Sequence, residues 1–221
     1  MNHTLEVDSV MLEFGPKRVL QDVYIKCETG KITAILGRNG TGKTCLMDII
    51  HGMLKAGNQS VRLDGKAFLR ASRSSSDMRY LTQLNYIPKV LRLKRIFKDF
   101  KLDYSEFVDH FPEFEKYYNL RLRKLSGGER RIVEIYMIIA SETKFCLLDE
   151  PFSHIMPVHT ETIKDLIIRG KKNKGILITD HMYEHIAEVY DELYVIRNGK
   201  TYLTKSMQDL ETLGYLRQQE E

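Results

Sequence analysis

One stretch of the chain has the residue types and the spacing of a phosphate-binding loop. Residues Gly37 to Thr44 read Gly-Arg-Asn-Gly-Thr-Gly-Lys-Thr and fit the pattern G-x-x-x-x-G-K-[ST]. The glycines let the backbone curl so that successive N–H groups point at phosphate oxygens, and the start of the following helix adds partial positive charge. We expect Lys43 to reach the β- and γ-phosphates of a nucleotide and the Thr44 hydroxyl to ligate Mg²⁺. The full set of expected contacts is Gly37, Asn39, Gly40, Thr41, Gly42, Lys43, Thr44 and Cys45.

Two carboxylates, Asp149 and Glu150, follow an apolar run that ends at Leu148. In an open parallel sheet, ligands bind outside the carboxyl ends of the strands, which is where this pair is expected. Asp149 would hold Mg²⁺, directly or through water, and Glu150 would act as general base toward an attacking water. The alternative is that the two acidic residues only end a strand and face solvent.

A second candidate anion site follows Leu125. Its residues are Ser126, Gly127, Gly128 and Glu129. Ser126 can cap a helix, and the glycines expose backbone N–H groups to an anion. One nucleotide does not need two such helix starts, so the second would serve a different nucleotide.

The elements that must position these residues alternate between strands and helices, which predicts an α/β fold with a parallel sheet and an N-terminal antiparallel β part. The alternative for residues 37–44 is a glycine-rich turn that binds nothing. The predicted strand before them and the predicted helix after them argue against it. Strands are predicted at Leu5–Phe14, Val19–Cys27, Lys31–Leu36, Met78–Thr82, Phe145–Asp149, Gly175–Thr179, Leu193–Arg197 and Lys200–Leu203. Helices are predicted at Cys45–Leu54, Gly128–Ala140, His159–Arg169, Met182–Val189 and Met207–Glu221.

The middle of the chain differs in character, because Leu84–Lys124 is rich in Lys, Phe, Tyr and Leu. Short amphipathic helices are expected at Val90–Phe100, Ser105–His110 and Glu113–Tyr118. The prediction is one domain over residues 1–221, with a core of about 1–83 and 125–221 and an inserted helical subdomain of about 84–124.

Composition excludes several classes of protein. The 221 residues carry 34 Lys and Arg against 30 Asp and Glu, and this mild excess is interleaved, so no specific nucleic-acid partner is expected. Three widely spaced cysteines suit a reducing compartment. No apolar run approaches the roughly 18 residues of a membrane span, and the N-terminus lacks a signal peptide's apolar core.

The ordered motifs resemble those of the ATP-binding cassette (ABC) ATPase family. Leu125 to Glu129 is similar to its LSGGQ signature, with Glu at the fifth position. Asp149-Glu150-Pro151 resembles its Walker B segment, Gln83 the Q-loop glutamine and His181 the switch histidine. Phe14 stands where the family places an aromatic residue that stacks on adenine. The resemblance covers about Leu5 to Leu203.

The resemblance implies ATP and Mg²⁺ as ligands and a head-to-tail dimer. Each ATP would lie between the phosphate loop of one subunit and Ser126, Gly127, Gly128 and Glu129 of the other. Glu150, His181 and Gln83 would be catalytic, and Thr44, Gln83 and Asp149 would hold the metal ion. A rival register places Lys89 at the Q-loop position, but its ammonium cannot accept the hydrogen bonds of a metal-bound water.

One segment departs from the family pattern. After Pro151 the family continues with a D-loop of the Ser-Ala-Leu-Asp type, which crosses the dimer. This chain has Met156 where the aspartate is expected, although Ser153 is retained. The departure bears on coupling across the dimer and not on nucleotide binding.

The function implied by the resemblance is ATP hydrolysis that powers transport through a separate membrane-spanning subunit. The chain would then lie on the cytoplasmic face of the cell membrane as a peripheral subunit. The groove for that subunit is expected beside Gln83–Lys89, with Phe97, Phe100 and Tyr104 as apolar anchors or, alternatively, as the subdomain's own core. The charged rim of the groove would be Arg92, Lys94 and Arg95. A soluble ABC ATPase acting on ribosomes or nucleic acid, and a module that binds ATP without hydrolysis, are the alternatives.

Overall fold

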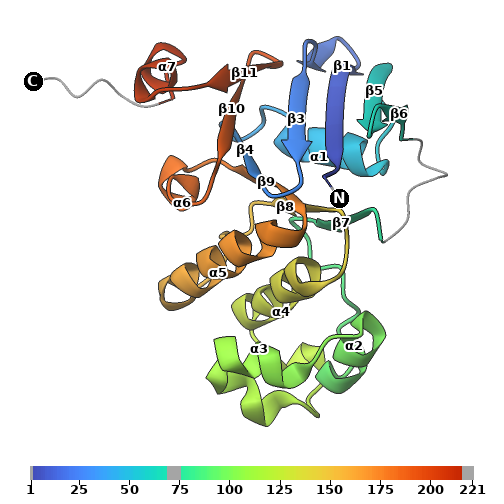
Figure 1. Ribbon diagram of the computed structural model, residues 1–221, viewed down its shortest axis with the longest axis vertical. Coiled ribbons are helices and arrows are strands. Elements are labelled where there is room, and N and C mark those ends of the chain that lie inside the picture. Colours follow the sequence, from blue (N-terminus) through green and yellow to red (C-terminus); the bar gives the residue numbers. More distant parts are fainter. Residues whose placement is uncertain (1, 69–75, 216–221) are drawn as a thin grey trace, which may run out of the picture.

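The computed structural model describes residues 2–68 and 76–215, which form two β-sheets with helices between and below them (Figure 1). The six-stranded sheet has the order β11-β10-β4-β9-β8-β7, and all of its neighbouring pairs are parallel except the β10–β11 hairpin. Its strands are β4 (Ile32–Leu36), β7 (Met78–Leu81), β8 (Phe145–Asp149), β9 (Gly175–Asp180), β10 (Glu192–Arg197) and β11 (Lys200–Thr204). The strands β4, β8 and β9 are buried at every residue, as expected for parallel strands that are covered on both faces. The predicted α/β fold with a parallel sheet is confirmed.

The second sheet is antiparallel and contains the N-terminus of the chain. Its strands are β1 (Thr4–Phe14), β2 (Lys17–Leu20), β3 (Tyr24–Glu28), β5 (Asn58–Leu63) and β6 (Lys66–Ala67). The prediction of one strand over Val19–Cys27 is wrong. The segment divides because Leu20 pairs with Leu12 near one end of β1, whereas Tyr24 pairs with Asp8 further along it. The strands β5 and β6 were not predicted.

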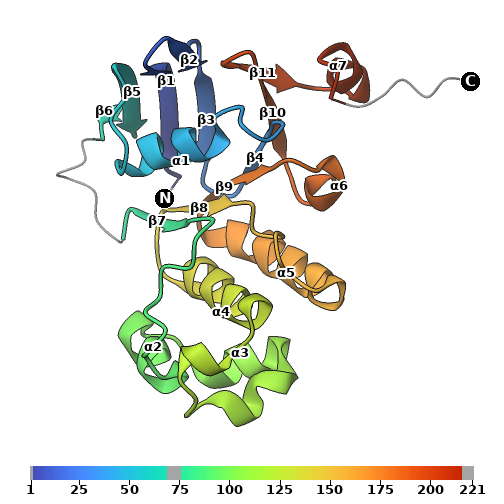
Figure 2. The same cartoon turned by 180° about the vertical axis from the view of Figure 1, so that it is seen from behind.

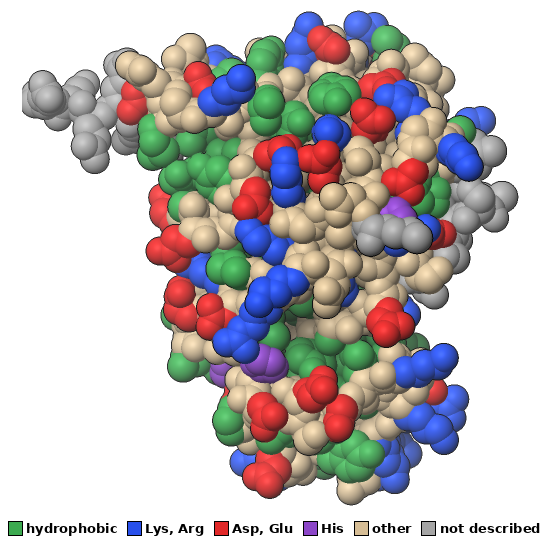
Figure 3. Space-filling model, in the orientation of Figure 1, with side chains coloured by type: hydrophobic (Ala, Val, Ile, Leu, Met, Phe, Trp, Pro, Cys, Tyr) green, Lys and Arg blue, Asp and Glu red, His purple; other side chains and the backbone are tan. Residues whose placement is uncertain are grey.

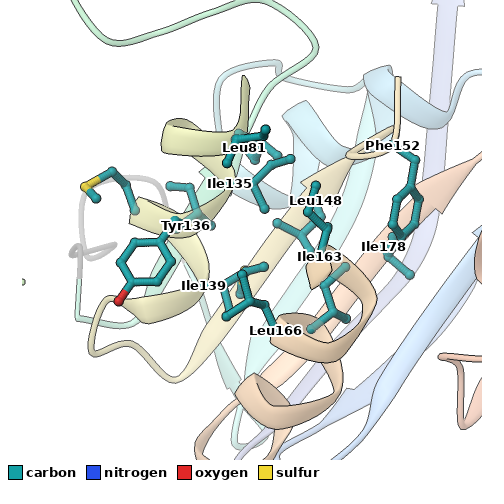
Figure 4. Close-up of a cluster of buried hydrophobic side chains, with 14 of the residues drawn as sticks. Leu81, Ile135, Tyr136, Ile139, Leu148, Phe152, Ile163, Leu166 and Ile178 are labelled. Carbon is teal, nitrogen blue, oxygen red and sulfur yellow. The ribbon is translucent and has the colours of Figure 1, made fainter. Parts of the chain in front are cut away.

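Helices cover both faces of the six-stranded sheet. Helix α1 (Lys43–His51) lies between the two sheets, and α4 (Gly127–Ala140) and α5 (Pro157–Gly170) lie on the opposite face (Figures 1 and 2). Figure 4 shows the core under α4 and α5, where Ile135, Ile139 and Ile163 approach Leu148 and Ile178 of the sheet. A second apolar core joins α1 to the antiparallel sheet. The phosphate loop therefore lies at the junction of both sheets.

The three predicted helices of the middle region are present with changed bounds: the first begins three residues later, the second one residue earlier, and the third is a 3₁₀ helix displaced by one residue. The region contains α2 (Leu93–Phe100), α3 (Tyr104–His110) and two 3₁₀ helices (Pro112–Tyr117 and Leu122–Lys124). Phe107 is fully buried at their centre, with its ring centroid 5.0 Å from those of Phe114 and of Tyr136 on α4. The helical insert of the predicted fold class is thus confirmed, while the division at residues 84 and 124 stays a prediction.

The aromatic side chains proposed as exposed anchors belong to this core instead. Phe97 is only 2% exposed, and its ring meets that of Tyr104 edge-on at 4.8 Å. Phe100 is half-buried under the guanidinium of Arg79, which lies 4.9 Å from its ring. Of the two alternatives for Phe97, the subdomain's own core is therefore confirmed and the apolar anchor is wrong, because a small helical unit needs its largest side chains for its own core.

The C-terminal part returns to the edge of the six-stranded sheet. It contains a 3₁₀ helix (Lys171–Asn173), α6 (Tyr183–Ile186), the hairpin β10–β11 and α7 (Met207–Thr212). The hairpin turns at Asn198 and Gly199, both with positive φ (52° and 76°), as the Asn-Gly pair predicts. The helix predicted over Met207–Glu221 ends early at Thr212, and residues 216–221 lie outside the described part.

On the face drawn in Figure 3, positive and negative side chains are interspersed. No helix in the described residues is both long and apolar enough to cross a membrane. The three cysteines are unpaired, and burial raises the pKa of Cys27 and Cys146 to about 12.

Candidate functional site

The loop of residues 37–44 joins β4 to α1 and has the backbone of an anion site. Gly40 and Gly42 have φ of +81° and +98°, values that favour glycine. A side chain at Gly42 would also come within 2.8 Å of Val19 Cγ1. Helix α1 begins at Lys43, so its first N–H groups and its positive dipole end face the loop.

A cavity of about 490 Å³ opens beside this loop. Its lining joins the loop to β2, to the segment after β7 and to the end of β8. The lining residues are Phe14, Lys17, Val19, Asn39, Gly40, Gly42, Lys43, Thr44, Cys45, Gln83 and Glu150. Strands β4 and β8 thus bring Glu150 close to Lys43 and Thr44, although Glu150 lies far from them in the sequence.

Lys43 is buried at the base of the cavity. Its Nζ donates a hydrogen bond of 2.8 Å to the Gly37 carbonyl and lies 3.3 Å from Oε1 of Glu150. The side chains of Lys43 and Glu150 are only 4% and 14% exposed. The Nζ also donates a longer hydrogen bond of 3.4 Å to the Arg38 carbonyl, so a phosphate oxygen at the cavity would take the place of that acceptor.

Asp149 lies behind Thr44, out of contact with solvent. Burial raises the pKa of Asp149, while hydrogen bonds from the hydroxyls of Thr179 and Thr44 lower it. The carboxylate of Asp149, the hydroxyl of Thr44 and the amide oxygen of Gln83 are hard oxygen donors of the kind that Mg²⁺ prefers. No cluster of three metal-binding side chains occurs among residues 2–68 and 76–215. Since Mg²⁺ is usually bound through one or two carboxylates plus phosphate and water, this donor set fits it.

Glu150 has an unusual backbone conformation, with φ of +46°. A non-glycine residue in this region costs on the order of 1–2 kcal/mol, so neighbouring contacts must hold it. Its N–H donates to the Thr179 carbonyl (3.1 Å), and its own carbonyl accepts from the Arg131 guanidinium (3.2 Å). The Nδ1 of His181 lies 3.5 Å from Oε1 of Glu150. That nitrogen is buried and makes no hydrogen bond within the described part of the chain.

Arg131 and Glu134 of α4 are functional candidates that the sequence analysis did not identify. Arg131 also donates to the carbonyls of Asp149 (2.8 Å) and Thr82 (2.5 Å). The Oε1 of Glu134 accepts from the N–H groups of Tyr86 (3.1 Å) and Ile87 (3.0 Å). The available signal was two charges on the apolar face of a predicted buried helix. The hydrogen bonds of both side chains connect α4 to the segments that carry Gln83 and Glu150.

Gln83 and Lys89 are the two candidates for the Q-loop position. Gln83 lines the cavity, whereas Lys89 is absent from its lining in the described residues and offers its carbonyl to Arg123 (2.8 Å). The geometry therefore favours Gln83 over Lys89 for this position.

The outer end of the cavity is formed by Phe14 and β2. Phe14 is 53% exposed and pairs with Lys17 across a tight hairpin. Lys17 and Val19 were missed, although the Gly15-Pro16 turn after Phe14 signals that the next residues fold back beside it. An exposed ring at the mouth can stack on a base.

The residues of the second anion site lie elsewhere. Ser126 is the N-cap of α4, and its side chain accepts from the Glu129 N–H (3.2 Å) while the Glu129 carboxylate accepts from the Ser126 N–H (2.7 Å). A Cβ at Gly128 would lie 3.0 Å from the His154 carbonyl. Among the described residues, Ser126, Gly127, Gly128 and Glu129 do not line the phosphate-loop cavity.

Comparison with known proteins decides the family. The family model described as ABC transporter matches residues 20–153. The lipopolysaccharide export system ATP-binding protein LptB of Haemophilus influenzae is 30% identical over 90% of this chain and 89% of that protein. LptB of Escherichia coli K12 is 31% identical over 89% of this chain and 88% of that protein. The chain belongs to the ABC transporter family.

Solved structures of this ABC family share the fold. An ATP-binding subunit of an ABC transporter aligns with a TM-score of 0.78 at 20% identity, over 96% of this chain and 93% of that one. A nucleotide-free ATP-binding cassette aligns with a TM-score of 0.76 at 22% identity, over 97% and 96%. The chain is an ATP-binding, ATP-hydrolysing ABC subunit that serves transport through a separate membrane partner, as predicted.

Proposed function

We propose that this ABC subunit binds ATP with Mg²⁺ in the phosphate-loop cavity and hydrolyses it with residues that line the cavity and with His181, which contacts the cavity residue Glu150. The observation that carries the proposal is that the Nζ of Lys43 and the Nδ1 of His181 both lie close to Oε1 of Glu150, at 3.3 and 3.5 Å. A buried lysine supplies charge for the γ-phosphate, and a carboxylate beside it supplies a base. This is the pairing that phosphoryl transfer to water needs.

The proposed roles follow from position. Phe14 stacks on adenine at the cavity mouth, and the N–H groups of residues 39–45 hold the phosphates. Bound Mg²⁺, held by Thr44, Asp149 and Gln83, would neutralise charge on the β- and γ-phosphates. Glu150 takes a proton from the attacking water as its oxygen bonds to the γ-phosphorus and the bond to ADP breaks. Lys43 and His181 stabilise the charge on the transferred group.

We also propose that two copies, or two related subunits, associate head to tail. Support comes from the separation of Ser126, Gly127, Gly128 and Glu129 from the cavity, because their exposed helix start can meet a second nucleotide only across an interface. Each ATP would then be held by the loop of one subunit and the α4 start of the other.

Substitutions at Lys43 and Glu150 separate binding from chemistry. Lys43→Ala should abolish binding of a fluorescent ATP analogue. Glu150→Gln keeps the side chain's shape but not its basicity, so it should retain binding, lose about 10²–10⁴-fold in turnover and accumulate an ATP-dependent dimer. Glu106→Gln removes an exposed carboxylate of α3 and is the matched control.

Two results would contradict this assignment. Unchanged turnover in Glu150→Gln would remove Glu150 from the reaction. A purely monomeric Glu150→Gln protein in light scattering with ATP and Mg²⁺ would contradict the shared site.

We propose that the membrane partner docks beside the Q-loop, and that this chain lies on the cytoplasmic face of the membrane as a peripheral subunit. The apolar side chains exposed there are Leu84 (81%), Val90 (64%) and Tyr86 (37%), which replace the anchors expected from the sequence. Leu84→Asp should reduce co-purification with solubilised membranes, whereas Met53→Asp, at an exposed position just after α1, should not. Recovery of the unmodified chain with ribosomes or DNA instead would overturn the docking proposal.

A further inference from the structure

The end of α7 turns the chain back toward the ATP site. Gly214, with φ of +66°, donates its N–H to Glu211 (2.7 Å), and the N–H of Tyr215 donates to Leu210 (2.8 Å). These two bonds form a Schellman motif, which glycine favours because of its left-handed backbone. Leu210 is buried, so the turn is anchored in the core and Tyr215 is directed inward.

Residues 212–215, here called the C-terminal strap, touch three segments of the six-stranded sheet's carboxyl edge. The Tyr215 hydroxyl donates a hydrogen bond to the His181 carbonyl. Arg38, inside the phosphate loop, donates to the Gly214 carbonyl (3.1 Å). Arg197 at the end of β10 donates to the Thr212 carbonyl (3.2 Å). The strap therefore bridges the loop that carries His181 and the loop that holds phosphate, beside α7 in Figures 1 and 2.

The two bridged loops also contact each other. The N–H of Gly37 donates to the carbonyl of Asp180 (3.3 Å), and the carboxylate of Asp180 accepts from the N–H groups of His181 (2.7 Å) and Met182 (2.9 Å). The first two bonds fix the backbone before His181. The third fixes the peptide group after it, and the carbonyl of that group, which belongs to His181, also accepts from Tyr215.

The Tyr215 hydroxyl is suited to act as a permanent donor. Burial raises the pKa of Tyr215 to about 12, so the hydroxyl keeps its proton at neutral pH. The acceptor is a backbone carbonyl, which means that the bond depends on the course of the loop and not on the His181 side chain.

We propose that Tyr215 is a positioning residue, which holds the His181 loop so that the imidazole faces Glu150 and the γ-phosphate. This inference rests on the role proposed above for His181. Tyr215 itself does not line the cavity within the described part of the chain, so it acts through His181. Loss of its hydroxyl should lower the rate of hydrolysis while leaving ATP affinity in place.

Tyr215→Phe tests the proposal, with Tyr183→Phe as the matched control. The Tyr183 hydroxyl also connects α7 to the segment after His181, because Tyr183 begins α6 and donates a hydrogen bond of 3.3 Å to the Met207 sulfur at the start of α7. Tyr215→Phe should lower kcat about threefold to tenfold, the size expected for losing one hydrogen bond that positions a reacting group. The dissociation constant of fluorescent ATP and the melting temperature should match those of Tyr183→Phe.

A double substitution distinguishes positioning from general stability. In single-turnover assays at high enzyme concentration, Tyr215→Phe should have no further effect in a His181→Ala background, because the hydroxyl then has no imidazole to position. The bond to the residue-181 carbonyl survives that substitution, so a merely structural effect would persist. Equal kcat in Tyr215→Phe and Tyr183→Phe, or the same fall in the His181→Ala background, would overturn the proposal. Unchanged turnover in His181→Ala alone would instead overturn the role of His181.

Discussion

The carboxyl edge of the parallel sheet and the helical insert are built on different principles, although both contact α4. At the sheet edge, hydrogen bonds and buried charges hold Lys43, Asp149 and Glu150, and the backbone of Glu150 is strained. In the insert, aromatic rings fill the space around Phe107, with the rings of Phe111 and Phe114 centred 5.2 and 5.0 Å away. The hydrogen bonds at the sheet edge fix the orientation of the side chains there, whereas the aromatic rings of the insert fill the volume of its core.

This difference predicts how each region responds to change. A hydrogen-bonded site loses its chemistry when one atom is removed, while the surrounding fold survives. An aromatic core loses packing and transfer free energy in proportion to the atoms removed. Substitutions in the insert should therefore reduce stability, and substitutions at the sheet edge should reduce turnover.

The largest effect on stability is expected for Phe107→Ala. Truncating a fully buried phenylalanine costs about 3–5 kcal/mol of unfolding free energy. ATP affinity of the folded fraction should be unchanged, because Phe107 lies in the insert and not at the cavity. Urea unfolding and fluorescent ATP titration measure the two quantities. A matching loss of ATP affinity would break the comparison, since the insert would then shape the site.

The same difference explains what the sequence could and could not predict. Parallel strands place their carboxyl ends at one edge, so residues 37–44 and Glu150, which follow strand ends, were expected together, while His181 was added by the resemblance to the ABC family. The fold class followed from the alternation of strands and helices. Local patterns sufficed because each motif sits at the end of its own element.

Other features depend on contacts between distant segments, and local patterns did not specify those contacts. The division of Val19–Cys27 into two strands results from pairing with different parts of β1. The burial of Phe97 depends on Tyr104 and on Tyr136 of α4, whose rings are centred 4.8 and 6.1 Å away. Arg131 is 49 residues from the carbonyl of Thr82 that it binds. Tyr215 lies beyond the stretch in which motifs were recognised.

Glu134 provides an intermediate test, since it joins α4 to the Q-loop. Burial raises the pKa of Glu134 above its ordinary value of 4.5, against the opposing effects of its hydrogen bonds and of Arg131. A raised pKa in the folded state means that the stability contributed by this group is present below about pH 4.5 and is lost as pH rises through the folded-state pKa. Glu134→Gln keeps the acceptor for Tyr86 and Ile87 but cannot ionise.

The unfolding free energy of the unsubstituted protein, taken relative to that of Glu134→Gln, should therefore be lower at pH 8 than at pH 5. Urea titrations at the two pH values measure this difference. The interval lies roughly above the pKa of an ordinary glutamate. A difference that stays constant or rises with pH would show that Arg131 pairs with the carboxylate strongly enough to outweigh burial. In that case α4 would belong with the charge-based site and not between the two regions.

The smallest effect is expected at Met156, on the side of the sheet edge. Met156 is the N-cap of α5, is 56% exposed and makes no side-chain cap hydrogen bond. An aspartate there can accept from the first N–H groups of α5 and complement its dipole, which stabilises a helix by about 1 kcal/mol. Met156→Asp should therefore raise the unfolding free energy by about that amount, and Met156→Ser, which caps without charge, should raise it similarly.

Only the aspartate adds a charge that could reach across the proposed dimer, so a change in the Hill coefficient for ATP should occur in Met156→Asp alone. Equal Hill coefficients in both variants and in the unsubstituted protein would mean that position 156 affects α5 and nothing beyond it.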